Sequence, residues 1–126
     1  MGLIEDFYTR LTTYPGLTAL ISDRIWPVEA EQGVKEPYCV YEQVSGGRRY
    51  SHDGYSNLQR PRMQISCYAD TYEMAKGIAA KVTEALETWS SVNLNGVFQQ
   101  NELDLIDPET GFYVVSVDFF IWYREG

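Results

Sequence analysis

The sequence is poor in the residues that build catalytic and metal centres. Its 126 residues include one histidine and two cysteines, whereas common zinc sites need three or four such ligands at close spacing. Two cysteines are also too few for a disulfide scaffold, and they suit synthesis in a reducing cytoplasm. No GxxxxGK[ST] or GxGxxG pattern is present, so no phosphate-binding glycine loop is expected. The sequence therefore predicts no cofactor and no metal.

Long apolar runs are also missing. No stretch of about 18 apolar residues occurs, so we expect no transmembrane helix. Glu5 and Asp6 come early, and no long apolar stretch follows, which argues against a signal peptide. The length favours a single domain over residues 1–126. Hydrophobic residues make up 44% and charged residues 22%, as in ordinary globular proteins.

Basic residues are scarce and unevenly placed. There are 10 of them against 18 acidic residues, a net charge of −8. Such a balance argues against a general binder of nucleic acid or of anionic membranes, since both need a positive field. Residues 46–64, however, hold four arginines and one acid, a net charge of +3, while the remaining residues hold 6 bases and 17 acids, a net charge of −11.

Three segments have helical periodicity. Residues 3–13 form a short amphipathic pattern, and residues 17–21 predict a further helical turn. The strongest pattern covers residues 71–89, with an apolar stripe on one side. Asp70 is expected to cap this helix, and Glu73 would complete a capping box.

The other regular segments read as strands. We expect them over residues 24–28, 37–44, 62–68, 97–106 and 112–124. Pro27 marks the first as an edge strand. The second and third are best joined as an antiparallel pair, which would place Cys39 nearly opposite Cys67. Two buried thiols are favoured there over a disulfide.

The last two predicted strands form a second pair, joined by a turn over residues 107–111. The final strand alternates apolar residues on its core face, yet Phe120 and Trp122 fall on the other face. An apolar second face suggests that something covers it, for example another subunit.

A catalytic centre is hard to assemble from these residues. His52 and Asp53 are neighbours in a loop, and adjacent residues rarely give the orientation that a Ser-His-Asp arrangement needs. A solvated histidine is the favoured interpretation. No nucleophile has an activating base at a suitable spacing, so the sequence predicts that the protein is not an enzyme.

Three carboxylates offer the alternative of a hard-cation site. Glu102, Asp104 and Asp107 could supply oxygen ligands, as in a small metal-dependent enzyme. The favoured interpretation is the solvated face of an antiparallel sheet, with Leu103 and Leu105 pointing inward.

Residues 46–60 form either a long loop or the tip of an extended hairpin, and long loops are usually functional. The candidate interaction residues in and beside it are Arg48, Arg49, Tyr50, Tyr55, Arg60 and Arg62. Arg and Tyr are enriched at protein interfaces and also suit single-stranded nucleic acid, while a soluble loop without a partner is the third alternative. The acidic remainder would repel a polyanion but attract this segment from another copy. A contact of that kind is heterologous and can close into a ring.

Several segments, in order, resemble one protein family. They are Tyr14-Pro15-Gly16-Leu17-Thr18-Ala19-Leu20, Asp23-Arg24-Ile25-Trp26-Pro27, Pro37-Tyr38-Cys39-Val40-Tyr41-Glu42-Gln43-Val44-Ser45-Gly46, Arg62-Met63-Gln64-Ile65-Ser66-Cys67-Tyr68-Ala69 with the helix start Thr71-Tyr72-Glu73-Met74-Ala75, and Phe112-Tyr113-Val114-Val115-Ser116-Val117-Asp118-Phe119. Together they resemble the tail completion (tail terminator, tail-to-head joining) proteins of bacteriophages with long, non-contractile tails.

The resemblance implies an α+β single domain. Its sheet would be mainly antiparallel, with room for a parallel pair, and have about four to five strands, with one long and one or two short helices on one face. It also implies a structural virion protein, encoded by a phage or prophage. The protein would be assembled into the tail in the cytoplasm of the host bacterium. A ring, typically of six copies, would cap the tail tube protein, meet the head-completion (stopper) protein and let DNA pass unbound, with no membrane partner. The resemblance carries over no catalytic residue. A small acidic binding module and the metal-dependent enzyme remain the alternatives.

Overall fold

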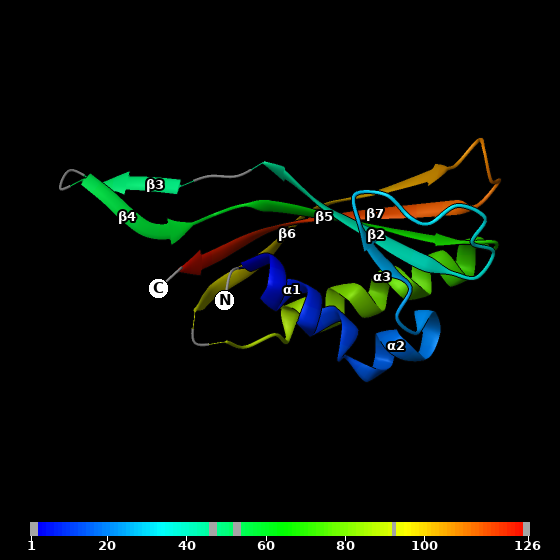
Figure 1. The fold of residues 1–126 in the computed structure, drawn as a ribbon, viewed down its shortest axis with the longest axis horizontal. Coiled ribbons are helices and arrows are strands. Elements are labelled where there is room, and N and C mark those ends of the chain that lie inside the picture. The colour runs from blue at the N-terminus through cyan, green and yellow to red at the C-terminus, as the bar shows by residue number, and fades with distance from the viewer. Residues whose placement is uncertain (1–2, 46–47, 52–53, 92, 125–126) are drawn as a thin grey trace.

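The three helices of the described part of the chain lie on one face of a mixed β-sheet (Figure 1). The computed structural model describes residues 3–45, 48–51, 54–91 and 93–124, and gives the backbone alone for residues 45, 48–51 and 54–59. In chain order the elements are α1 (Leu3–Thr12), α2 (Pro15–Ile21), β1 (Ile25–Pro27), β2 (Tyr38–Ser45), β3 (Arg48–Ser51), β4 (Gly54–Gln59), β5 (Arg62–Ala69), α3 (Tyr72–Glu87), β6 (Leu94–Ile106) and β7 (Tyr113–Arg124). The predicted α+β class is confirmed.

Strand β7 is central, because β5 pairs with one of its edges and β6 with the other. Strand β2 lies beyond β5, and β1 lies outermost on that side. Only the β1–β2 pair among the described strands is parallel, so the sheet is mixed as expected. Pro27 ends β1, and its place at the sheet edge confirms the prediction for this proline, which has no N–H to donate.

Strands β3 and β4 form an antiparallel hairpin, which we call the arm. Strand β4 continues the row of β5 along β7, because Leu58 pairs with Arg124 and Arg62 with Phe120 in one unbroken register. Between those pairs the Pro61 carbonyl accepts a hydrogen bond from the backbone N–H of Ile121, with an N–O distance of 3.0 Å. The arm therefore extends the sheet beyond the helices (Figure 1).

The core lies between the helices and the sheet. Phe7 and Leu11 of α1, Ile78 and Val82 of α3, and Phe119 of β7 are at most 1% exposed. Burial of each such side chain contributes about 1.5–3 kcal/mol relative to exposure. None of the described helices combines the length and apolar character needed to cross a membrane.

Helix α3 begins with a different cap from the predicted one. Thr71 has an extended backbone (φ −124°, ψ 150°), and its hydroxyl accepts the Met74 N–H at 3.2 Å. The predicted capping box of Asp70 and Glu73 is therefore wrong, because the helix is capped by Thr71, one residue later. The helix also ends at Glu87, two residues earlier than expected.

The two cysteines lie directly opposite each other on β2 and β5, as predicted. Cys39 and Cys67 are fully buried and free, with their Sγ atoms 3.7 Å apart. The neighbouring Cys39 thiol and burial raise the pKa of Cys67. The pair thus packs as two small buried thiols, because thiolate formation is disfavoured in apolar surroundings.

The cap of α3 can be tested with neighbouring substitutions. Thr71→Ala should lower the free energy of unfolding by about 1 kcal/mol, since the Met74 N–H loses its acceptor. Asp70→Ala is the matched control and should have a much smaller effect, because the Asp70 side chain is exposed and outside the cap. Urea denaturation followed by circular dichroism would measure both. Equal losses would contradict the assignment of the cap to Thr71.

Candidate functional site

Four of the six residues predicted to form an interaction site lie on the arm. Arg48, Arg49 and Tyr50 belong to β3, Tyr55 belongs to β4, and the backbones of the two tyrosines are paired across the hairpin. The structure thus brings these four positions together at one end of the sheet. Residues 52–53, which include the only histidine, lie outside the described part of the chain.

Arg60 lies at the base of the arm, against aromatic rings of β7. Its guanidinium carbon is 4.4 Å from the centroid of the Phe120 ring and 5.7 Å from that of Trp122. These rings alternate with the buried Phe119 and Ile121, so they lie on the sheet face away from the helices. We call this the open face. A cation over an aromatic ring is attracted by the ring quadrupole, so Arg60 covers part of the apolar surface that the sequence had indicated.

Arg62 is engaged within the chain at the centre of the open face. Its guanidinium forms an ion pair with Asp118, whose side chain is 5% exposed while that of Arg62 is 40% exposed. Arg62 Nε and Asp118 Oδ1 have no hydrogen-bond partner. The neighbouring hydroxyls of Ser66 and Ser116 lie 2.9 Å apart. A buried carboxylate needs its partner to offset desolvation, so one role of Arg62 is to stabilise Asp118.

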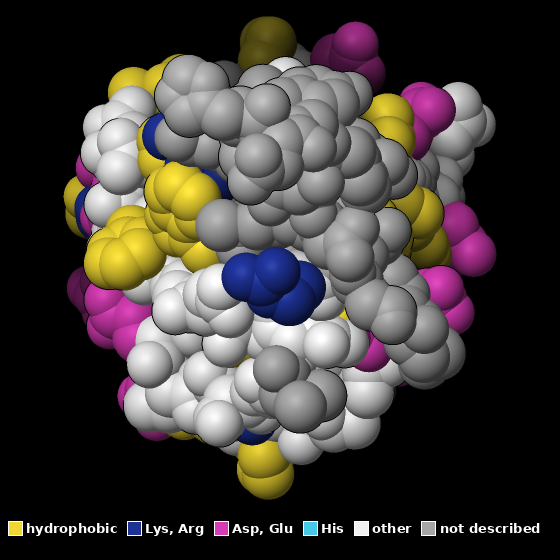
Figure 2. All heavy atoms as spheres, turned by 90° about the vertical axis from the view of Figure 1, so that its left-hand side faces the viewer, with side chains coloured by type: hydrophobic (Ala, Val, Ile, Leu, Met, Phe, Trp, Pro, Cys, Tyr) yellow, Lys and Arg dark blue, Asp and Glu magenta, His cyan; other side chains and the backbone are white. Residues whose placement is uncertain are grey.

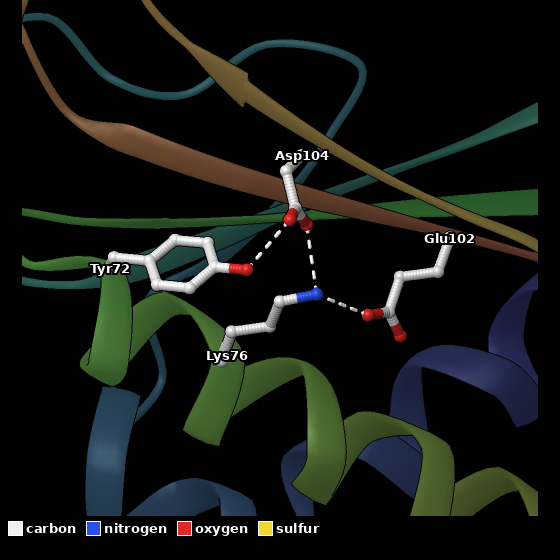
Figure 3. Close-up of polar contacts among 4 residues, drawn as sticks. All are labelled: Tyr72, Lys76, Glu102 and Asp104. Carbon is white, nitrogen blue, oxygen red and sulfur yellow. Dashed lines mark hydrogen bonds and ion pairs between the residues drawn. The ribbon is translucent and has the colours of Figure 1, made fainter.

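Glu102 and Asp104 of β6 are held by helix α3 (Figure 3). Lys76 Nζ lies 2.5 Å from Glu102 Oε2 and 2.9 Å from Asp104 Oδ1, and the Tyr72 hydroxyl donates to Asp104 Oδ2 at 2.7 Å. These bonds from Lys76 and Tyr72 lower the pKa of Asp104. The bonds to Glu102 and Asp104 raise the pKa of Lys76. The four side chains form a clamp between α3 and β6.

The third candidate metal ligand is occupied in a turn. Asp107 Oδ1 accepts the Glu109 N–H at 3.0 Å, and its Oδ2 accepts the Thr110 hydroxyl at 3.0 Å. Among the described residues, no group of three His, Cys, Asp or Glu side chains is placed to hold a metal ion. The metal-dependent enzyme therefore gains no support from this cluster.

The predicted orientation of β6 is wrong. Glu102 and Asp104 face the helix layer, while Leu103 and Leu105 lie on the open face and are each 49% exposed. A bulge between Gln99 and Asn101 inserts one extra residue, and an extra residue reverses the alternation beyond it. The periodicity that would carry Leu103 and Leu105 inward is therefore interrupted.

The open face along β6 is an apolar surface that sequence reasoning missed. Phe98 is 55% exposed, and Leu103 and Leu105 lie on the same side. Directly across the β6–β7 pair, Phe98 faces Phe120. The sequence holds these apolar residues, but the bulge hides the fact that they share a face. An exposed apolar strip of this kind is typical of a contact surface.

Comparison with known proteins gives a family and a fold. The family model described as "Tail completion protein gp17" matches residues 5–124. A chain in a solved structure titled "Virion of native gene transfer agent (GTA) particle" has the same fold, with a TM-score of 0.72 and 15% identity over 94% of this chain and 92% of that chain. The search of curated proteins found no match.

The clamp predicts a pH dependence of stability. Because the pKa of Asp104 is lowered in the folded protein, the ionised Asp104 side chain stabilises the fold at pH values above its ordinary pKa of about 3.9. This contribution is lost as the pH falls through the lowered pKa. Lys76→Met should therefore reduce the melting temperature near pH 7, and its difference from wild type should shrink in acid. Lys35→Met, at an exposed loop position, is the control. A difference that stays constant down to pH 2 would argue against the clamp.

The Arg62–Asp118 pair predicts non-additive substitutions. Arg62→Met should cost about 1–3 kcal/mol, because it leaves the buried carboxylate unpaired. Combining it with Asp118→Asn should cost less than the sum of the single substitutions, by about 0.5–3 kcal/mol. A double-mutant cycle by urea denaturation measures this coupling, and additive losses would mean that the two side chains act independently.

Proposed function

The chain belongs to the tail completion protein gp17 family, and from that membership we propose that it closes the finished tail tube as a ring. It is a structural protein of the bacteriophage tail, located in the virion. In the proposed role about six copies form the ring, one side of which meets the tail tube protein and the other the head-completion (stopper) protein. The observation that carries the proposal is the family match over residues 5–124.

The distribution of charge supports a ring of identical copies. The segment 46–64, which contains the arm, has a net charge of +3, and the remaining residues have −11. A basic arm meeting an acidic flank of the next copy is a heterologous contact, and such contacts close into rings when the rotation allows.

The same charge supports a conduit for DNA. Seen from the end that carries the arm, acidic side chains lie on both flanks of the molecule (Figure 2). A net negative charge of −8 disfavours retention of a polyanion. We propose that DNA passes through the ring without specific binding and that no membrane takes part.

We propose no catalytic role. The candidate carboxylates serve the α3–β6 clamp and a turn, which gives them structural tasks. No observation favours the enzyme or the isolated binding module over the tail role.

The ring can be tested through the arm. Arg48→Glu combined with Arg49→Glu should weaken ring formation and tube capping about tenfold or more, since repulsion replaces attraction at a charged interface. The fold should be unchanged in circular dichroism. The assay mixes the variant with tubes of the cognate tail tube protein and counts capped ends by negative-stain electron microscopy.

Lys35→Glu combined with Lys81→Glu is the matched control, because it changes the net charge equally but lies outside the arm. If the arm variant caps tube ends at the same protein concentration as the wild type, the two arginines do not take part in the interface. Failure of the wild-type protein to bind tube ends would contradict the proposed function itself.

A further inference from the structure

Strand β6 has a long free edge. Among the described strands it pairs only with β7, although it spans Leu94–Ile106. From Asn101 to Ile106 the register of β6 with β7 has no irregularity. The backbone N–H and C=O groups that point away from β7 are therefore regularly spaced along the free edge. The strand contains no proline and no basic residue, which are common means of blocking an edge. This edge is therefore able to accept another strand.

The surface beside this edge is both apolar and exposed. Leu103 and Leu105 are each 49% exposed, and Phe98 is 55% exposed, all on the open face. A strand added to β6 would lie next to these side chains and shield them. Exposed apolar groups along a free edge favour a protein partner rather than a small polar ligand.

The charge near the edge identifies the partner. Residues 94–112 contain four acids and no base, whereas strand β3 of the arm carries Arg48 and Arg49 and no acid. The complement of the β6 surface is thus carried by the chain itself, on the arm. Opposite charge of this kind steers association and selects the partner.

The free edge of the arm and the free edge of β6 lie at opposite edges of the sheet. Strand β3 pairs only with β4 among the described strands, so its outer edge is also free. It lies on the β2 side, whereas β6 lies beyond β7. The arm also projects past the helix layer (Figure 1), where a neighbour can reach it. Contact between two different surfaces of identical chains continues from copy to copy.

We propose that the arm of a second copy docks on β6, with the free edge of its β3 along residues 101–106 and its strands beside the apolar open face. The docking makes the sheets of neighbouring copies continuous. It rests on the proposed ring, since it specifies how the copies meet.

Cross-linking tests this contact in the full chain. A variant with Ser51→Cys on β3 and Leu103→Cys on β6 is treated with a short bis-maleimide under conditions of assembly, alone and on tail tubes. It should give a ladder of covalent oligomers, while each single variant stops at dimers. Leu105→Cys provides a second position on the same face, with the same exposure of 49%. The native Cys39 and Cys67 are fully buried and contribute equally to every sample.

The control variant pairs Ser51→Cys with Thr9→Cys, an exposed position of α1 in the helix layer. The cross-linked fraction of this control should be at most about a tenth of that of the Ser51→Cys, Leu103→Cys variant, because only docked cysteines share a high effective concentration. Absence of the ladder at both β6 positions, or cross-linking to the tube protein alone, overturns the proposed docking. Rings or capped tubes without the ladder leave the proposed function intact. Absence of both rings and tube binding contradicts the function as well.

Discussion

Strand β7 pairs along both edges, and the positions of the other elements follow from that pairing. Strands β5 and β4 share one edge in a single register, and β6 takes the other. On one face Val115, Val117 and Phe119 are fully buried. That face needs a cover of apolar helices, because an exposed apolar sheet face would be unstable. The helices are thereby confined to one side, and the other side stays open over much of β6.

The same pairing fixes the base of the arm. Leu58 of β4 pairs with Arg124 at the end of β7, and Arg60 lies over the β7 rings. Tyr123 is fully buried, and its hydroxyl donates to Asp6 of α1. Each of these contacts connects the last residues of strand β7 to a different part of the molecule. The arm is thus anchored where the sheet, the N-terminal helix and the aromatic rings meet.

The sequence predicted elements whose local patterns agree with their surroundings. The apolar stripe of α3 and the opposition of Cys39 and Cys67 were both correct, since a helix period and an antiparallel pair follow from neighbours along the chain. The cap at Thr71 was missed because Asp70 is an equally good capping residue, and only the backbone of the folded chain decides between them. The bulge near Gln99 was missed because nothing in the local residues marks an extra position in a strand. The role of Arg62 depended on Asp118, a residue distant in sequence.

The reversal of β6 has a physical meaning beyond the error in prediction. A free-standing domain would gain most by turning Leu103 and Leu105 toward its helices. Here the helix receives Glu102 and Asp104 instead, through Lys76, and the leucines are left half exposed. Exposed ion pairs stabilise little in water, so the arrangement gives up hydrophobic stabilisation within the chain. Local choices that disagree with the isolated fold are expected at functional surfaces. A structural protein of a virion can recover that stabilisation when a neighbour covers the leucines, because binding to the folded state adds to its stability. The orientation of β6 is thus reasonable for a subunit and poor for a monomer.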